Sequence, residues 1–213
     1  MRIAELLGRE KSQVSRTLKT LAAHGFVDRD PDTLEYRLGW RLYTLAARTG
    51  RTRLLALAPA QLRQLVHELG ETAHLSVLDG DEVLTLLSER SPRVVQASDW
   101  SGQRVPAHST SSGRALLFDA EPAALPADLH RHIAGARRLG YAAVDGEFEA
   151  GLVGVAAPVR DFRGRIVAAL NVSGPAFRLG EHLEAAGAAV KSAADELSRG
   201  LGQSDVNGGG LHA

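Results

Sequence analysis

The N-terminal stretch has apolar residues at helical spacing in two short segments. Residues 3–7 hold Ile3, Leu6 and Leu7, one face of a short helix that we expect to end at Gly8. Ser12 is a suitable N-cap for a second helix, which we expect to close at His24-Gly25. The apolar stripe of this second helix consists of Val14, Leu18, Leu21 and Ala22. The pattern therefore predicts a pair of helices joined by a tight turn.

The side of the second helix away from its apolar stripe is polar and basic, with no acidic residue. Two short apolar runs follow, Phe26-Val27 and Tyr36–Leu38, on either side of the turn former Asp30-Pro31-Asp32. Two helices and a hairpin make a winged helix-turn-helix, whose second helix lies in the major groove of DNA. The expected DNA contacts are Ser12, Gln13, Ser15, Arg16, Lys19 and Thr20 on the helix, and Arg29, Tyr36 and Arg37 in the wing.

A second helical pattern follows the wing. It runs from Arg41 to Ala58, is interrupted near Gly50, and predicts a linker helix between domains. Its apolar stripe fits a dimer seam, although packing within one domain is an alternative. We expect a further amphipathic helix to begin at Pro59 and to stop at Gly70.

The remainder mixes strand-like and helical patterns, which predicts an α+β domain with an antiparallel sheet. Asp79-Gly80-Asp81 is a hairpin turn between the first two strands, and the Gly-rich tail at 202–213 is expected to be disordered. The predicted strands are 72–78, 82–87, 94–97, 154–159 and 166–172, and the predicted helices are 115–118, 125–139 and 181–201.

Composition narrows the class of protein. The 213 residues contain no cysteine, which excludes disulfides, thiolate nucleophiles and cysteine-bound zinc. No signal peptide or membrane span is recognisable, so we expect a cytoplasmic protein without a membrane partner. Residues 1–53 hold 11 basic and 6 acidic residues (+5), whereas the rest hold 14 and 19 (−5), although the whole chain is neutral. A basic head on an acidic body suits a protein that touches phosphates at one end.

Candidate catalytic and metal-binding groups are few. His130 and His132 are two residues apart on a predicted helix and point to different faces, which makes a poor metal pair. Asp145, Glu147 and Glu149 have no nucleophile near them in the sequence, so we interpret them as a solvated acidic turn. No P-loop or nucleophile elbow is present. We expect no catalytic residues, no metal and no cofactor.

The motifs together resemble the IclR family of bacterial transcriptional regulators. SQVSRTLKTLAAHGFVDRDPDTLEYRLG is similar to the recognition helix and wing of that family, and TAHLSVLDGDEVLTL to the first hairpin of its effector domain. GQRVPAHSTSSGRALL and GYAAVDGEFEAGLVGVAAPVRDFRGRIVAALNVSGP resemble its later motifs, so that the likeness extends to about Leu201. The resemblance implies a winged helix-turn-helix at 1–39, a linker helix at 40–58 and a GAF-like effector domain at 59–201.

The resemblance also implies a ligand site and partners. By motif position, the effector contacts fall at Ser111, Ser112, Val144, Asp145, Gly154, Asn171 and Ser173. Some members that bind small oxo-acids carry an acid at the position of Val144 and a serine at that of Asn171. These departures argue against a small oxo-acid, and Val144 favours a less polar metabolite. The free N–H groups of a helix that begins near Gly113 would favour a carboxylate. A homodimer or homotetramer would bind a partly palindromic double-stranded DNA operator.

The winged domain of the family normally has a further helix before the one at Ile3, and we expect its absence to leave apolar side chains uncovered. A start codon assigned too far downstream would explain this, as would cover by the linker helix or a partner subunit. The alternative function is a GAF-like domain that binds or converts a small molecule, with the N-terminal head as an interaction module.

Overall fold

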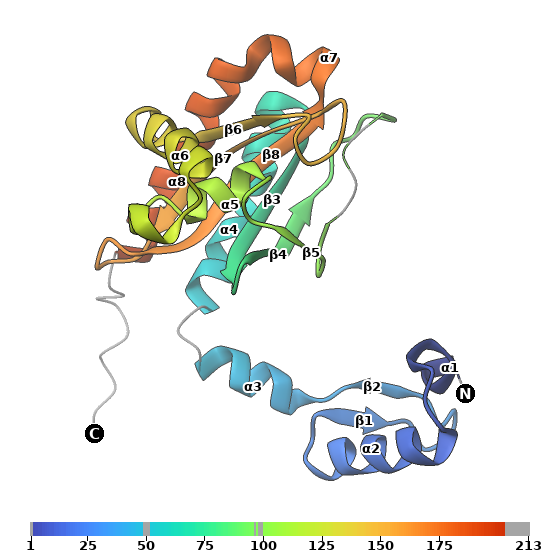
Figure 1. Ribbon diagram of the computed structural model, residues 1–213. Coiled ribbons are helices and arrows are strands. Elements are labelled where there is room, and N and C mark those ends of the chain that lie inside the picture. The colour runs from blue at the N-terminus through green and yellow to red at the C-terminus, as the bar shows by residue number, and fades with distance from the viewer. Residues whose placement is uncertain (1, 49–51, 96, 98–99, 203–213) are drawn as a thin grey trace. The chain divides into compact units, whose positions relative to one another are not determined.

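The chain forms two compact units, residues 1–53 and 54–213, in a computed structural model that describes residues 2–48, 52–95, 97 and 100–202. The first unit contains α1 (Arg2–Leu7), α2 (Lys11–Ala23), β1 (Val27–Arg29), β2 (Tyr36–Leu38) and α3 (Trp40–Arg48) (Figure 1). This order of two helices, a hairpin and a helix is the predicted one.

The α1–α2 turn differs in one detail from the expected one. Gly8 adopts a φ of 58° and ends α1, as predicted. The N-cap of α2 is Glu10, not Ser12, because Glu10 has extended backbone angles and its carbonyl accepts the N–H groups of Gln13 and Val14 at 3.0 and 3.1 Å. Ser12 lies in the first turn of the helix, where its side chain is exposed.

The core of the first unit is small. Ala4, Val14 and Leu18 are buried and pack with Tyr36 of the wing. The predicted face of α1 is mostly uncovered, since Leu6 and Leu7 are 77% and 62% exposed. An apolar groove runs between α1 and α2, lined in part by Ile3, Leu7, Val14, Leu18 and Leu21.

The helix α4 (Thr52–Leu69) contradicts the prediction that a new helix begins at Pro59. Pro59 lies inside α4, which runs unbroken across the expected domain boundary at residue 58. Its buried residues Leu54, Ala58, Leu62 and Leu65 keep helical spacing through the proline, so packing against the sheet favours one continuous helix. Gly70, with a φ of 70°, ends the helix as predicted.

The second unit is built on a six-stranded antiparallel sheet of order β5-β4-β3-β8-β7-β6. Its strands are β3 (Thr72–Asp79), β4 (Glu82–Glu89), β5 (Arg104–Pro106), β6 (Ala142–Asp145), β7 (Leu152–Arg160) and β8 (Ile166–Pro175). Its further helices are α5 (Ser111–Leu116), α6 (Ala127–Leu139), α7 (Ala176–Leu179) and α8 (Leu183–Gly202), with short 3-10 turns at Pro122–Ala124 and Gly180–His182.

Helices cover both faces of this sheet. Alternation along β3 and β8 sends Leu75 and Leu170 into a core with α4 and α8. The opposite face packs against α5 and α6, where Ile133 and Ala169 lie in a second core. Figure 1 shows these two helix layers on either side of the strands. The predicted α+β class with an antiparallel sheet is correct.

The structure differs from the predicted strands in two ways: two edge strands were not predicted, and one predicted strand is absent at Val94 and Val95. Val94 and Val95 form bends rather than a strand, and Val94 is 99% exposed, so neither has the packing that a strand face requires. Gln96, within the same predicted strand, lies outside the described residues. The edge strands β5 and β6 were not predicted. The tail at 203–213 also lies outside the described residues.

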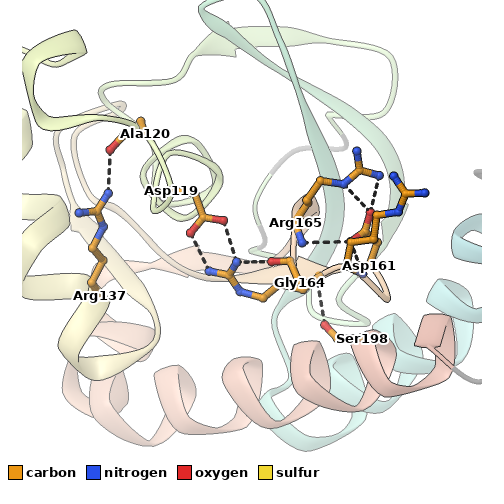
Figure 2. A network of polar contacts seen from close by, with 9 residues as sticks. Asp119, Ala120, Arg137, Asp161, Gly164, Arg165 and Ser198 are labelled. Atoms are coloured by element: carbon orange, nitrogen blue, oxygen red, sulfur yellow. Dashed lines mark hydrogen bonds and ion pairs between the residues drawn. The ribbon is translucent and has the colours of Figure 1, made fainter.

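A polar network fixes the β7–β8 turn against α8 and the loop that follows α5. The Arg160 guanidinium donates to both carboxylate oxygens of Asp119 at 2.7 and 3.0 Å and to the carbonyl of Gly164 at 2.6 Å. The Arg160 backbone N–H donates to Ser198 of α8 at 2.8 Å. Figure 2 shows this network, in which Arg137 of α6 also donates to the carbonyl of Ala120. The turn is therefore tied to the chain after α5 and to α8.

None of the helices within the described ranges has the length and apolar character needed to cross a membrane.

Candidate functional site

A cavity lies between the sheet and α5 of the second unit. Six of the seven predicted effector residues line it: Ser111, Ser112, Val144, Gly154, Asn171 and Ser173. They come from α5, β6, β7 and β8, so the fold brings together residues that are far apart in the sequence. The convergence of Ser111 and Ser112 with Asn171 and Ser173 is as predicted.

The floor of the cavity is a polar patch on the sheet. His74 pairs with Asn171 in the β3–β8 ladder, and Gly154 pairs with Ser173 in the β7–β8 ladder. Because Ala73, Leu75 and Val77 lie in the core with α4 and α8, the alternate residues His74 and Ser76 of β3 face the cavity. The cavity face of the sheet therefore carries polar residues at this point, whereas the opposite face carries aliphatic ones.

Hydrogen bonds hold these polar side chains in place. The Asn171 amide donates to Ser111 Oγ at 2.8 Å and to the carbonyl of Val155 at 3.1 Å, which joins β8 to α5. His74 is 3% exposed, with Nδ1 2.8 Å from Ser88 Oγ and Nε2 3.1 Å from Ser173 Oγ. The cavity therefore presents oriented hydroxyl, amide and imidazole groups rather than freely rotating ones.

Two glycines permit the close packing around the cavity. A Cβ on Gly154 would stand 2.8 Å from Ser111 Oγ, inside the polar cluster. A Cβ on Gly113 would stand 2.0 Å from the carbonyl oxygen of Ala107, so only glycine lets α5 approach that strand end so closely. Thr110 caps α5 by accepting the Gly113 N–H at 3.1 Å. The helix begins at Ser111, two residues before the predicted start.

The remaining walls are apolar and aromatic. Val83, Val105, Val144 and Leu152 line them, together with Trp100 and Phe148. The two rings meet edge to face, with centroids 5.4 Å apart and planes at 72°. Within the described lining, no lysine, arginine, aspartate or glutamate side chain is present. The cavity suits a small molecule with an apolar body and a few hydrogen-bonding groups.

One ion pair supports the cavity from outside its lining. Arg114 of α5 is buried and pairs with Glu147 of the β6–β7 loop, while its Nε donates to the His108 carbonyl at 3.3 Å. The expected solvated acidic turn is present, since Asp145, Glu147 and Glu149 are all exposed. The ion pair of Glu147 with a buried guanidinium 33 residues earlier in the chain was not predicted.

Asp145 departs from the predicted set. It is exposed at the end of β6 and is not among the residues that line the cavity, because alternation along β6 turns Val144 inward and its neighbour outward. His108, in the loop before α5, is likewise exposed and lies outside the lining.

Several lining residues were missed by the sequence reasoning: His74, Ser76, Thr85, Trp100 and Phe148. The signal for His74 and Ser76 was available, since polar residues alternate there with Leu75 and Val77 within the predicted strand 72–78. Trp100 and Phe148 lie in loops, where no periodicity marks a residue that faces a cavity.

The predicted DNA-facing residues of α2 lie on one surface of the first unit. Ser12, Gln13, Arg16, Lys19 and Thr20 are exposed, and Ser15 is half-buried. Val14 and Leu18, on the opposite side, are buried. The Thr20 hydroxyl donates to the Arg16 carbonyl at 3.2 Å. The exposed face carries two cationic side chains and several hydrogen-bonding groups.

The wing presents arginines and packs its tyrosine. Arg29 and Arg37 are exposed, whereas Tyr36 is half-buried against the small core, with the Arg29 guanidinium 5.6 Å from its ring centroid. At the tip, the backbone N–H groups of Thr33 and Asp32 donate to Asp30 and lower the pKa of its carboxyl. These bonds shape the turn that separates the two strands.

No cluster of three or more histidine, aspartate or glutamate side chains with metal-binding geometry occurs in the part of the chain that the structure describes.

Known proteins resemble this chain in both units. The "IclR helix-turn-helix domain" matches residues 1–31, and the "Bacterial transcriptional regulator IclR C-terminal" domain matches residues 46–127 and 123–199. The HTH-type transcriptional regulator BhcR of Paracoccus denitrificans is 34% identical over 93% of this chain and 79% of its own length. XynR of Escherichia coli, of the same type, is 33% identical over 80% of this chain and 76% of its own.

Solved structures agree. The crystal structure of an IclR homolog complexed with 4-hydroxybenzoate, from Microbacterium hydrocarbonoxydans, has a TM-score of 0.75 at 27% identity and covers 93% of this chain and 89% of its own. Fold, site and sequence lead to one conclusion: the chain belongs to the IclR family of bacterial transcriptional regulators, proteins that bind DNA and respond to small molecules.

Proposed function

We propose that the first unit binds a partly palindromic double-stranded DNA operator and that a small metabolite bound in the cavity of the second unit controls this binding. One observation carries the proposal: six positions at which family members bind effectors line one cavity, in a chain whose N-terminal unit exposes a basic helix face. Neither feature is needed for a folded protein, whereas a ligand-controlled regulator needs both.

On the DNA side, α2 is the recognition helix. Arg16 and Gln13 form bidentate hydrogen bonds to base edges in the major groove, while Lys19 and the hydroxyl residues hold phosphates. Arg29 and Arg37 of the wing contact the DNA backbone or the minor groove. The contribution of Tyr36 is indirect, because its ring supports the Arg29 guanidinium.

The effector is a small carboxylate or a less polar metabolite. The described lining offers serine and threonine hydroxyls, the Asn171 amide and the His74 imidazole, and it offers no lysine or arginine to pair with a multiply charged anion. Ser111, Ser112, Asn171 and Ser173 bind the polar end of the molecule, and Val144 and Gly154 lie against its body. The ligand is bound and released unchanged, so the protein is not an enzyme.

The protein acts as a homodimer or homotetramer in the bacterial cytoplasm, where the chromosome lies. A partly palindromic operator requires two winged units related by a twofold axis. Helix α3 supports such an assembly, since Trp40, Tyr43 and Leu45 are 78%, 66% and 41% exposed on a nine-residue helix. Effector binding shifts the arrangement of the paired DNA-binding units, so that the affinities for DNA and effector are coupled reciprocally.

Selection of binding sites from random double-stranded DNA by the full chain tests the first half of the proposal. We expect a sequence with twofold symmetry to be enriched. Fluorescence anisotropy on that sequence is then repeated with a panel of small carboxylic acids that includes 4-hydroxybenzoate, and a panel member should change the affinity. Ser112→Leu should abolish this response and leave DNA affinity unchanged, because the larger side chain fills the cavity.

Two controls separate the outcomes. Asp145→Leu, an exposed position outside the lining, should respond like the wild type. Chromatography of the effector after incubation should recover it unchanged. Failure to enrich any DNA sequence would contradict the DNA half of the proposal, and consumption of the small molecule would favour an enzyme.

A further inference from the structure

Two aromatic rings from different loops close one side of the cavity. Phe148 belongs to the loop between β6 and β7, and Trp100 precedes β5. Both are half-buried, both line the cavity, and they meet edge to face at a centroid distance of 5.4 Å. The two strands nearest to these residues are at opposite edges of the sheet, so the contact joins the loops of both edges over the cavity.

The residue that precedes Phe148 forms an ion pair with Arg114 of α5. The Arg114 side chain is only 7% exposed, so its guanidinium requires an acceptor, and Glu147 provides one from the residue next to Phe148. Arg114 is fixed in turn by the burial of α5 and by its bond to the His108 carbonyl at 3.3 Å. The ion pair thus clamps the β6–β7 loop onto the helix that carries Ser111 and Ser112.

The rings and the polar groups occupy different parts of the lining. Ser111, Asn171 and Ser173 are joined to the sheet and α5, whereas the rings come from the loops. An aromatic pair in edge-to-face contact offers a ring face and a ring edge to a third ring, which adds to the stabilisation from burial alone. A flat molecule with a hydrogen-bonding group at one end fits both parts.

We propose that Trp100 and Phe148 form a roof that selects a planar-ring effector, and that the Arg114–Glu147 pair is the positioning element of this roof. The proposal rests on the proposed function for the identity of the cavity as an effector site. The position of the roof, however, is a property of the ligand-free protein and is tested without any ligand.

The first experiment uses Trp100 as the reporter. The chain has two tryptophans, Trp40 and Trp100, so the background variant Trp40→Phe leaves one, and gel filtration verifies that its oligomeric state is that of the wild type. Glu147→Ala should release the loop and raise the acrylamide quenching constant of Trp100 roughly twofold or more, since local opening exposes the indole. Glu149→Ala removes an exposed carboxylate of the same loop and should leave quenching unchanged.

Glu147→Gln supplies the rescue. Its amide oxygen still accepts from Arg114, so quenching should return toward the background value, which a general loss of folding would not produce. Circular dichroism confirms that each variant is folded. Equal quenching in the Glu147→Ala and Glu149→Ala variants would overturn the positioning role of the pair. If Glu147→Ala fails to fold, Phe148→Leu is measured instead, and this variant must by itself raise the quenching of Trp100.

The second experiment compares a flat ring with a saturated one in thermal-shift titrations. The probes are 4-hydroxybenzoate and trans-4-hydroxycyclohexanecarboxylate, which share their polar groups. We expect the aromatic probe to bind more tightly, and Phe148→Leu to reduce that preference roughly two- to tenfold. Equal binding of both probes, or a preference that survives Phe148→Leu, would overturn ring selection. If neither probe shifts the melting temperature, ring selection fails for this chemistry, whereas the quenching result still decides the position of the roof.

Discussion

Asn171 of β8 donates a hydrogen bond to Ser111 Oγ of α5 across 2.8 Å and 60 residues of sequence. Its amide also donates to the Val155 carbonyl at 3.1 Å, and its side chain is 7% exposed. A buried amide with these partners fixes the distance between the sheet and the helix on which the cavity depends.

Asn171→Ala should therefore destabilise the protein by about 1–3 kcal/mol, because it leaves a buried hydroxyl and a carbonyl without their donor. Ser111→Ala should cost less, since Asn171 retains the Val155 carbonyl. Urea unfolding followed by circular dichroism measures both. Gln64→Ala, at an exposed position of α4, is the control, and an equal effect of Gln64→Ala and Asn171→Ala would contradict the role of this bond.

Arg16→Ala should weaken specific DNA binding by about 1–3 kcal/mol if Arg16 reads a base edge. The residue is exposed on the face of α2 opposite the buried Val14 and Leu18. Arg138→Ala removes the same charge from an exposed position of α6 in the second unit and is the matched control. Anisotropy at a fixed salt concentration measures both, and an unchanged affinity for Arg16→Ala would mean that the DNA-facing surface is assigned wrongly.

Much of the fold could be predicted because its signals are local. Glycine marks the ends of α1 and α4, where Gly8 and Gly70 have positive φ, and the Asp79-Gly80-Asp81 turn fixed the first hairpin. The predicted N-cap of α2 is two residues too late, because Glu10 and Ser12 are both polar residues at the start of the helix, with only Lys11 between them. Only the backbone angles distinguish them.

The rest depends on contacts between distant residues. The start of a helix at Pro59 was predicted from a local preference, and the burial of Leu54, Leu62 and Leu65 overrode it. In the site, the resemblance to a family located six lining residues by motif position. Trp100, Phe148 and the Arg114–Glu147 pair needed the tertiary structure, because an ion pair across 33 residues leaves no periodic pattern in the sequence.

Asp119→Asn should reduce the loss of unfolding free energy that the protein shows as the pH is lowered into the acid range. The hydrogen bonds from Arg160 lower the pKa of Asp119 in the folded protein. A carboxyl whose pKa is lowered by folding stabilises the protein at pH values above its unfolded-state pKa of about 3.9. This contribution is lost as the pH falls through the pKa of the folded state. The wild type should therefore exceed Asp119→Asn in stability at neutral pH, and this difference should begin to fall below about pH 4 and vanish only below the lowered pKa of the folded protein.

Urea unfolding at several pH values tests this, with Asp81→Asn as the control because Asp81 is an exposed aspartate in the β3–β4 turn. The control should follow the wild type at every pH. A difference between wild type and Asp119→Asn that stays constant into acid would show that the ion pair of Figure 2 does not contribute through ionisation.

Two glycine-to-alanine changes in helices should have opposite effects. Gly113→Ala places a Cβ 2.0 Å from the Ala107 carbonyl oxygen, and since this neighbour is backbone, α5 must move, at a cost of about 1–3 kcal/mol or more. Gly135 lies inside α6 with open space around its Cβ, so Gly135→Ala should stabilise the protein by about 0.5–1 kcal/mol through helix propensity. Thermal unfolding of both variants gives the signs directly, and a neutral Gly113→Ala would contradict the close approach of α5.

The Glu71–Arg178 pair should behave as a coupled unit. Glu71 is 2% exposed, and the Arg178 guanidinium donates to both of its carboxylate oxygens at 2.6 and 2.9 Å. Arg93 is 3.7 Å from the same carboxylate and 46% exposed, which makes it the weaker partner. Arg178→Met leaves a buried carboxylate without its bidentate partner and should destabilise the protein by about 3–5 kcal/mol.

The double variant Glu71→Leu/Arg178→Met decides whether this cost comes from the ion pair. It removes both charges and should recover most of the lost stability, since a buried pair replaced by apolar side chains is often neutral. Arg138→Met, at an exposed site, controls for the loss of an arginine. If the double variant is as unstable as the sum of its single changes, then the two residues act independently, and the contact between the start of β3 and α7 must be stabilised by other packing.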